Sequence, residues 1–265
     1  MSGSVQRIYA LVMRHIHIWR SSVMRLIDSI YWPAVQMVMW GFLTQYLMPQ
    51  ASFVAQAAGV LLSGLLLWEV VVRGNLSLSI AFLEEMWSRN LGHLFVSPIR
   101  SWEMATGIII VALLRTLLGL IPVSLLCWAF FGYSIYSLGL PLLAFFVILQ
   151  MFSWSIGLAM SGMIMRVGQS AESFAWAAVF ILMPMSGVYY PISVLPHWLQ
   201  VIAYGLPTAY VFEGMRHIMA EKVVHWDLLA IAFGLSVVYL IIGFQVFQWF
   251  FRLSRRAGSL LGQGE

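Results

Sequence analysis

Three charged residues lie deep inside long apolar runs, where a charge is costly to bury in lipid. Glu69 and Arg73 fall near the middle of one run, and Arg115 falls near the middle of the next. Because residues four apart share one face of a helix, Glu69 and Arg73 can pair. Charges at this depth usually face the interior of a helix bundle or a wet cavity. Two interpretations therefore stay open: the three residues line a translocation path, or they form a structural ion pair that fixes two helices together.

The sequence lacks the motifs that would let it do covalent chemistry alone. Its only lysine, Lys222, has no glycine-rich loop before it, which excludes a phosphate-binding P-loop. The motifs HExxH and GxSxG are absent, and the single cysteine, Cys127, excludes a cysteine-based metal cluster. The six histidines fall in loops, interfacial helices or span ends, which argues against haem. We therefore expect this chain to be no enzyme and to bind no cofactor or metal itself; ATP and Mg²⁺ would bind a partner subunit.

The composition is that of a polytopic membrane protein. Hydrophobic residues make up 62% and charged residues 9% of the 265 residues, whereas a soluble domain carries roughly 25% charged residues. Apolar stretches of about 20 residues recur, and each is long enough to cross a hydrocarbon core of about 30 Å. We predict an all-α fold that forms one transmembrane domain over 1–265. Its six spans are predicted at 26–47, 57–82, 105–130, 138–165, 174–190 and 228–251.

Arginine and lysine in the short connections predict the orientation. Six spans put both termini on one side, with ten arginines there and only Arg216 and Lys222 on the other. We therefore expect a multi-pass protein of the cell (inner or plasma) membrane with both termini in the cytoplasm. These span-end residues also explain the net charge of +4, so we expect contact with membrane lipid and none with nucleic acid.

Two connecting segments carry amphipathic patterns. In 5–20, Ile8, Val12 and Ile16 recur at helical spacing among basic residues, which is typical of an interfacial helix on a headgroup surface. In 84–95, polar and apolar residues interleave at roughly helical spacing. This second segment is either a docking helix for a partner protein or a helix that rests on the membrane. The residues expected to contact the partner are Glu84, Glu85, Trp87, Arg89 and His93.

The stretch 191–216 is apolar but interrupted. Pro196, Gly205 and Pro207 break it too often for one helix to cross a bilayer, because proline removes an amide donor and clashes with the preceding turn. Freed backbone groups have no partner in lipid, so such a segment must be shielded by protein or lie at the interface. We predict two short re-entrant helices that dip into the extracytoplasmic face over 196–219.

Two stretches resemble the signatures of one family. The sequence LFVSPIRSWEMATG resembles a cytoplasmic segment of ABC transporter permeases of the type-2 exporter class, and LPHWLQVIAYGLPTAYVFEGMR resembles the signature after their fifth span. The resemblance covers nearly the whole chain. It implies a permease subunit that pairs with a second copy, as a homodimer, and with two P-loop ATP-binding subunits, to export drugs, lipids or lipid-linked glycans. It also implies a coupling helix at 84–95 and an extracytoplasmic gate that includes Pro196, Trp198, Gly205, Pro207 and Arg216.

Two other classes of protein compete with this interpretation. The first is a secondary transporter or channel that works without ATP. Broken helices also occur there, typically at the midplane and in paired inverted repeats, whereas this sequence has one broken segment and no internal repeat. The second is a membrane scaffold without transport. A P-loop ATPase that is encoded beside this chain and copurifies with it would separate both from an ABC permease.

Overall fold

The computed structural model describes residues 3–21, 23–47, 52–87, 99–168 and 172–257. These residues form helices and connecting turns, with no strand among them, so the predicted all-α class is confirmed. The α-helices are α1 (Gly3–Arg20), α2 (Val23–Leu47), α3 (Ser52–Trp87), α5 (Ser101–Phe131), α6 (Leu140–Val167), α7 (Glu172–Met185), α8 (His197–Ala203), α9 (Pro207–Glu221) and α10 (Trp226–Ala257). Two 3-10 turns, η2 (Ile135–Leu138) and η4 (Ile192–Val194), lie between them.

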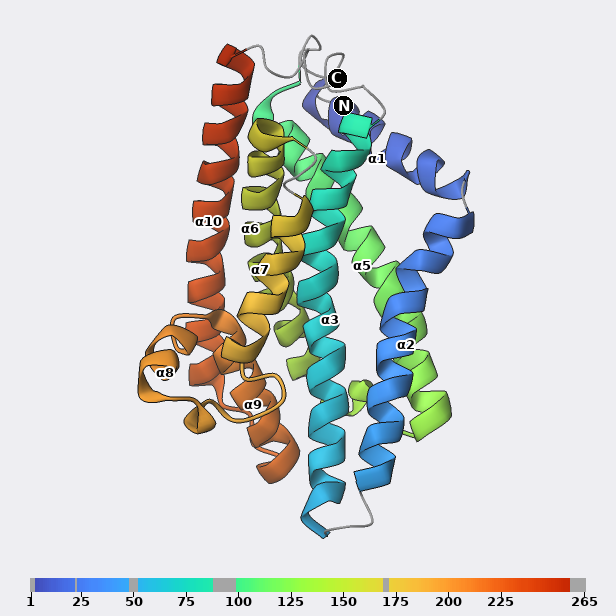
Figure 1. Cartoon of the computed structure of the whole chain (residues 1–265), viewed down its shortest axis with the longest axis vertical. Helices are drawn as coiled ribbons and strands as arrows, with labels where there is room; N and C mark the ends of the chain where they lie inside the picture. Colours follow the sequence, from blue (N-terminus) through green and yellow to red (C-terminus); the bar gives the residue numbers. More distant parts are fainter. Residues whose placement is uncertain (1–2, 22, 48–51, 88–98, 169–171, 258–265) are drawn as a thin grey trace.

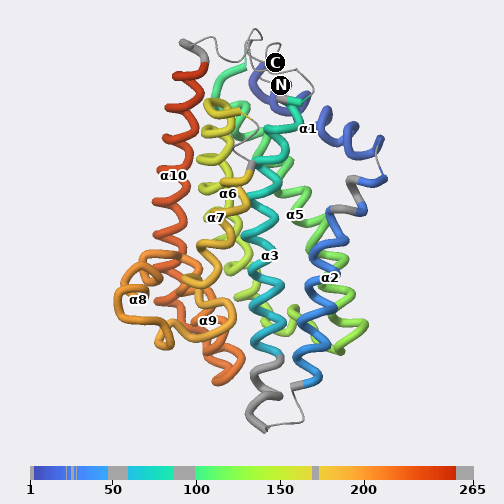
Figure 2. Tube along the Cα trace, viewed as in Figure 1, coloured from blue at the N-terminus to red at the C-terminus, as the bar shows by residue number. Residues whose placement is uncertain are grey.

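The long helices run up and down a single bundle (Figure 1). Both termini lie at the same end, where α1 crosses the bundle, and the short helices α8 and α9 lie in the opposite half (Figure 1). The tube in Figure 2 follows the same path from α2 through α3, α5, α6 and α7 to α10. The chain therefore reverses direction at each end of the bundle, as expected for a polytopic membrane protein.

Four described helices are long and apolar enough to cross a membrane: Gly59–Glu85, Ser101–Phe131, Leu140–Val167 and Trp226–Ser254. Helix α2 has 25 residues, roughly 38 Å at 1.5 Å per residue, but Gln36 and Gln45 make it less apolar. Helix α7 has 14 residues, roughly 21 Å, which is shorter than a hydrocarbon core of about 30 Å. The six-span layout therefore stays a prediction for α2 and α7.

Helix α7 ends at Met185, earlier than the predicted end of the fifth span at 190. Pro184 removes an amide donor in the last turn. Gly187 then adopts φ 69°, a left-handed conformation that favours glycine. The N–H of Ser186 donates to the carbonyl of Leu182 at 2.9 Å and closes the helix. The apolar composition therefore continues past this turn, whereas the helix does not.

Helix α3 is the centre of the bundle and α10 lies at its edge. In the most apolar part of α3, 83% is buried inside the protein, whereas the corresponding fraction in α10 is 22%. Two glycines allow neighbouring helices to approach α6 closely. A Cβ at Gly157 of α6 would lie 2.7 Å from Cβ of Leu78 in α3, and one at Gly243 of α10 would lie 2.3 Å from the carbonyl oxygen of Ser155. The backbone spacing of the bundle therefore depends on residues without side chains.

The segment predicted as a separate coupling helix, 84–95, begins inside α3. Helix α3 is continuous to Trp87, beyond the predicted end of the second span at 82. The remaining residues of that segment, among them Arg89 and His93, lie outside the described residues. Helix α1 buries Leu11, His15 and Trp19, which recur every four residues along one of its faces. This stripe packs α1 onto the bundle, which the sequence had predicted only to lie on a headgroup surface.

Candidate translocation cleft

A cleft of ≈ 820 Å³ brings together side chains from α1, α2, α3, α5 and α7. Its polar part contains Glu69, Arg73, Glu84 and Arg115. Its walls carry aromatic and apolar side chains: Trp19, Met24, Trp32, Val72, Leu76, Ile80, Trp87, Leu118, Trp176 and Phe180. The three membrane charges singled out in the sequence therefore border one cavity.

Glu69 and Arg73 form the pair that their spacing predicts. Nε of Arg73 lies 3.4 Å from a carboxylate oxygen of Glu69, within the single helix α3. Both side chains are largely buried, with 17% of Arg73 and 9% of Glu69 exposed. The side chain of Arg73 also reaches α5, since a Cβ at Gly119 would lie 3.4 Å from its Nε. The pair therefore borders the cleft and also lies between two helices, so both interpretations stay open.

Arg115 pairs with Glu84, a partner 31 residues away that the sequence analysis had assigned to a different role. One Arg115 nitrogen donates to both carboxylate oxygens of Glu84, at 2.7 and 2.8 Å. The Arg115 guanidinium also lies 4.6 Å from the ring centroid of Trp19 in α1, an arrangement that favours a cation–π interaction. The pair joins α5 to α3 and to α1, so it is a brace between helices as well as part of the cleft wall.

Glu85 also faces the interior of the protein. Its carboxylate lies 2.6 Å from Arg14 and 3.5 Å from His15, both in α1. His15 is fully buried, and its Nδ1 lies 3.0 Å from the Leu11 carbonyl. Helix α1 is thereby fastened to the end of α3.

A second ion pair fastens α1 to the start of α5. Arg7 donates to both carboxylate oxygens of Glu103, at 2.6 and 2.9 Å. These hydrogen bonds raise the pKa of Arg7 above its ordinary value. Glu103 also accepts a hydrogen bond from the Arg100 N–H at 2.9 Å, which caps α5. Helices α1, α3 and α5 are therefore joined by ion pairs at the end of the bundle where α1 begins.

The predicted coupling residues divide into three groups. Glu84 and Glu85 are paired inward, as described above. Trp87 is 49% exposed and borders the cleft. Arg89 and His93 lie outside the described residues. The sequence pattern missed the inward pairing because their partners come from α1 and α5, which are distant in the chain.

At the far end of the bundle, α9 holds the turn that follows α7. Arg216 donates to the carbonyls of Gly187 and of Tyr190, the latter at 2.9 Å. Glu213 accepts from the Ile192 N–H at 3.1 Å, and Thr208 donates to the Ser186 hydroxyl at 3.0 Å. The backbone groups released at the end of α7 thus find partners on α9, as a broken segment inside a membrane requires.

The other predicted gate residues have different environments. Pro207 is buried at the first turn of α9, where a missing N–H is tolerated. Pro196 precedes α8 and is exposed, and Trp198 is 65% exposed. Gly205 lies between the two helices, where its carbonyl accepts from the Tyr239 hydroxyl of α10 at 3.2 Å. The two short helices were predicted; the contacts of Tyr239, Glu213 and Thr208 were not.

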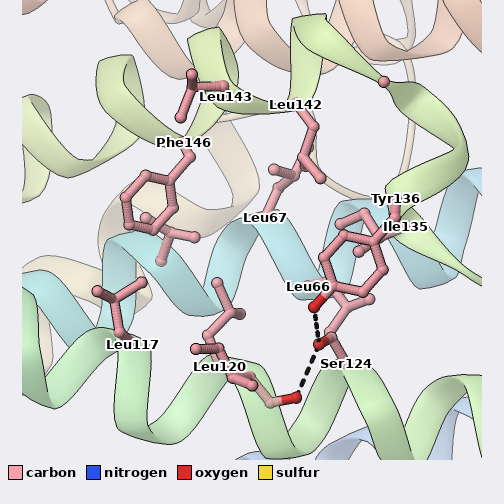
Figure 3. A pocket seen from close by; sticks show the side chains of 13 residues that line it. Leu66, Leu67, Leu117, Leu120, Ser124, Ile135, Tyr136, Leu142, Leu143 and Phe146 are labelled. Atoms are coloured by element: carbon pink, nitrogen blue, oxygen red, sulfur yellow. Dashed lines mark hydrogen bonds between the residues drawn. The ribbon is translucent and has the colours of Figure 1, made fainter.

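A second cavity, of ≈ 330 Å³, lies between α3, α5, α6 and η2 (Figure 3). Leucine, isoleucine, valine and phenylalanine side chains form most of its wall. Its polar contact is the Ser124 hydroxyl, which donates to the Ile121 carbonyl and lies 2.8 Å from the Tyr136 hydroxyl (Figure 3). The cavity therefore suits an acyl chain or another apolar group.

Long apolar helices around a cleft with buried ion pairs indicate a membrane protein, and comparison with known families gives its class. The family model described as ABC-2 type transporter matches residues 6–220, more than half of the chain. The chain therefore belongs to the ABC-2 type transporter family, and the resemblance noted in the sequence is confirmed. A comparison with curated protein sequences found no match. The chain is thus a multi-pass membrane protein and the transmembrane component of an ABC transporter.

Proposed function

We propose that this chain is the membrane-spanning subunit of an ATP-driven exporter that carries a lipid, a lipid-linked glycan or a drug-like molecule. Two copies pair, and each binds one P-loop ATPase subunit that holds ATP and Mg²⁺. The complex lies in the cell (inner or plasma) membrane with both termini in the cytoplasm. The chain itself supplies the path, and its partner supplies the energy.

The cleft is the observation that supports this function. An amphiphilic cargo needs a polar surface for its head and an apolar surface for its tail. The ion pairs of α3 and α5 offer hydrogen-bond donors and acceptors at membrane depth, and Trp32, Trp176 and Phe180 offer apolar area beside them. Exposed aromatic side chains on α2 and α7, such as Trp32 at 60% and Phe180 at 63%, suit contact with cargo, lipid or a second copy.

Coupling to the ATPase would reach the cleft through α1. Movement of the partner at the cytoplasmic end would shift α1, which is paired to α3 through Arg14 and Glu85. Trp19 of α1 lies against Arg115, whose carboxylate partner Glu84 borders the cleft. A nucleotide can drive this shift only by favouring one state of the complex over the other. The segment 84–95, whose residues after Trp87 lie outside the described part of the chain, remains the proposed docking segment. Helices α8 and α9 form the proposed outer gate.

Copurification tests the proposal. The tagged chain is isolated in detergent from cells that also express the P-loop ATPase encoded beside it. We expect a stable complex with equal numbers of the two subunits, two of each by native mass spectrometry, and ATP hydrolysis that rises with the cargo. Transport by the isolated chain in sealed vesicles, without any nucleotide-hydrolysing subunit, would support the secondary transporter instead and would overturn the proposal.

A further inference from the structure

Two histidines and one glutamate converge where α9 ends, away from the cleft. Nδ1 of His217 lies 3.4 Å from Oε1 of Glu221, and Nε2 of His225 lies 3.9 Å from Oε2 of Glu221. The two imidazole rings are 4.7 Å apart between centroids. One nitrogen or oxygen from each residue falls within 4.8 Å of the others. The group lies in the half of the bundle opposite the termini, where α9 is labelled (Figure 1).

The backbone brings the third residue to the other two. His217 and Glu221 are four apart in the last turns of α9, so they share one face. Lys222 then adopts φ 56° and ends the helix, with its N–H donating to the Ile218 carbonyl at 3.0 Å. This left-handed residue turns the chain back, and His225 comes to lie beside His217 immediately before α10 begins at Trp226.

The spacing of these atoms matches a metal site. Zn²⁺ binds histidine nitrogen and carboxylate oxygen at about 2.0–2.2 Å in a tetrahedron. Ligand atoms in such a tetrahedron are therefore separated by roughly 3.3 Å. The two histidine nitrogens lie 3.4 and 3.9 Å from different carboxylate oxygens of Glu221, and the three ligand atoms all fall within 4.8 Å, which is somewhat wider than this value. Closing the site around an ion requires side-chain rotation at the exposed Glu221 and at the half-buried His217 and His225.

His225 has the surroundings of a ligand in particular. Its Nε2 is shielded from solvent and makes no hydrogen bond to a described residue. Its other nitrogen, Nδ1, lies 3.8 Å from Oδ1 of Asp227, an ion-pair separation that would have to shorten to become a hydrogen bond. A carboxylate at the second nitrogen of a metal-bound histidine fixes the ring orientation and raises its basicity. Asp227 therefore lies at one ring nitrogen of His225, while the other ring nitrogen faces Glu221, with His217 beside it.

We propose that His217, Glu221 and His225 bind one divalent transition metal of the zinc class, with water as the fourth ligand and Asp227 orienting His225. The ion ties the end of α9 to the start of α10 and braces the base of the proposed gate. The proposal departs from our expectation that the chain binds no metal. The histidine positions in the sequence show no metal-binding motif, because the chain reversal after Lys222 that brings His225 to His217 is a property of the backbone.

Zinc binding by the full chain tests the proposal. The protein is purified in detergent without a polyhistidine tag, stripped with a chelator, and titrated with Zn²⁺ alone by calorimetry. Substitution by Co²⁺ adds an absorption spectrum that reports tetrahedral coordination. We expect one tight zinc site per chain, and at least a tenfold loss of affinity in His217→Ala, in His225→Ala and in Glu221→Gln. The control is His197→Ala, an exposed histidine of α8 outside the cluster, which should bind zinc as the unmodified chain does.

Folding and metal binding can be separated in the same samples. Thermal unfolding of each metal-free variant reports its fold, and Glu221→Gln keeps the side-chain size at a position that is 55% exposed. If a histidine variant misfolds, the zinc affinity of Glu221→Gln decides whether the cluster binds the metal. No uptake of Zn²⁺ by the unmodified chain, or equal affinity in the cluster variants and the His197→Ala control, would overturn the proposal.

Discussion

Replacement of Glu84 by glutamine should destabilise the protein far more than the same replacement at Glu69. Glu84 accepts two hydrogen bonds from Arg115 across α3 and α5, at 2.7 and 2.8 Å, and its side chain is 8% exposed. Glu69 receives one longer contact of 3.4 Å from Arg73 in its own helix. Both pairs border the cleft, and the Arg115–Glu84 pair also joins α5 to α3.

The expected magnitudes differ accordingly. Removal of one partner from a buried ion pair costs about 3–5 kcal/mol, because it leaves a buried charge with less compensation. Loss of one hydrogen bond between charged groups typically costs about 1.5–3 kcal/mol. At about 2–4 °C per kcal/mol for a chain of this size, Glu84→Gln should lower Tm by about 6–20 °C and Glu69→Gln by about 3–12 °C.

Thermal unfolding followed by tryptophan fluorescence in detergent measures both changes. The double replacement Glu84→Leu with Arg115→Leu is the matched control. Replacement of both members of a buried pair by apolar residues is often neutral or stabilising, so the double variant should recover most of the lost stability. Persistence of the full loss in the double variant would show that the pair is not the cause.

Transport separates the two pairs further. The Glu69→Gln complex should assemble normally and carry its cargo at least tenfold more slowly, because the polar lining of the cleft is altered. Assembly that fails in Glu69→Gln while the surviving complexes transport normally would refute the assignment of Glu69 to the path. It would favour the structural interpretation that the sequence left open.

Three further predictions test other parts of the structure. Gly243→Ala should lower the free energy of unfolding by about 1–3 kcal/mol through overpacking against α6. Gly234 lies on the same helix with open space around it, so Gly234→Ala should raise the free energy of unfolding by up to about 1 kcal/mol. Thermal unfolding of both variants measures these changes, and equal effects would contradict the close approach at Gly243. Arg216→Ala should release the turn after α7 and raise hydrogen exchange there, and unchanged protection would contradict the bracing role. Arg14→Ala should weaken cargo-stimulated ATP hydrolysis by the complex, while Arg20→Ala, exposed on the same helix, should leave it intact; equal activity would remove α1 from the coupling route.

Local pattern predicted the elements that depend on neighbouring residues. Helical spacing in α1, the long apolar runs of α5 and α6 and the prolines around α8 were visible in the sequence. The ion pair between Glu69 and Arg73 was predicted because both members lie on one helix. The end of α7 at Met185 was not visible in the apolar pattern, because the left-handed turn at Gly187 is a property of the backbone.

Contacts between distant segments could not be predicted from these patterns. Glu84 and Glu85 were assigned to a partner surface because the segment 84–95 carries an amphipathic pattern and matches the position of the coupling helix in type-2 permeases. Their partners, Arg115 and Arg14, come from helices that fold back onto α3. The cluster at the end of α9 was missed for the same reason, because a left-handed residue at Lys222 brings His225 into place.

Accessibility of the cleft in different nucleotide states tests the central claim most directly. Cys127 is the only cysteine of the chain, so Cys127→Ser gives a background in which Ser77→Cys places one thiol at the cleft and Ser79→Cys places one in the buried side of α3. In sealed vesicles that contain the complex with its ATPase, we predict that a water-soluble thiol reagent labels position 77 in one nucleotide state and not in the other, and leaves position 79 unlabelled in both. Equal labelling of position 77 with and without ATP, in a complex that still transports, would contradict the account.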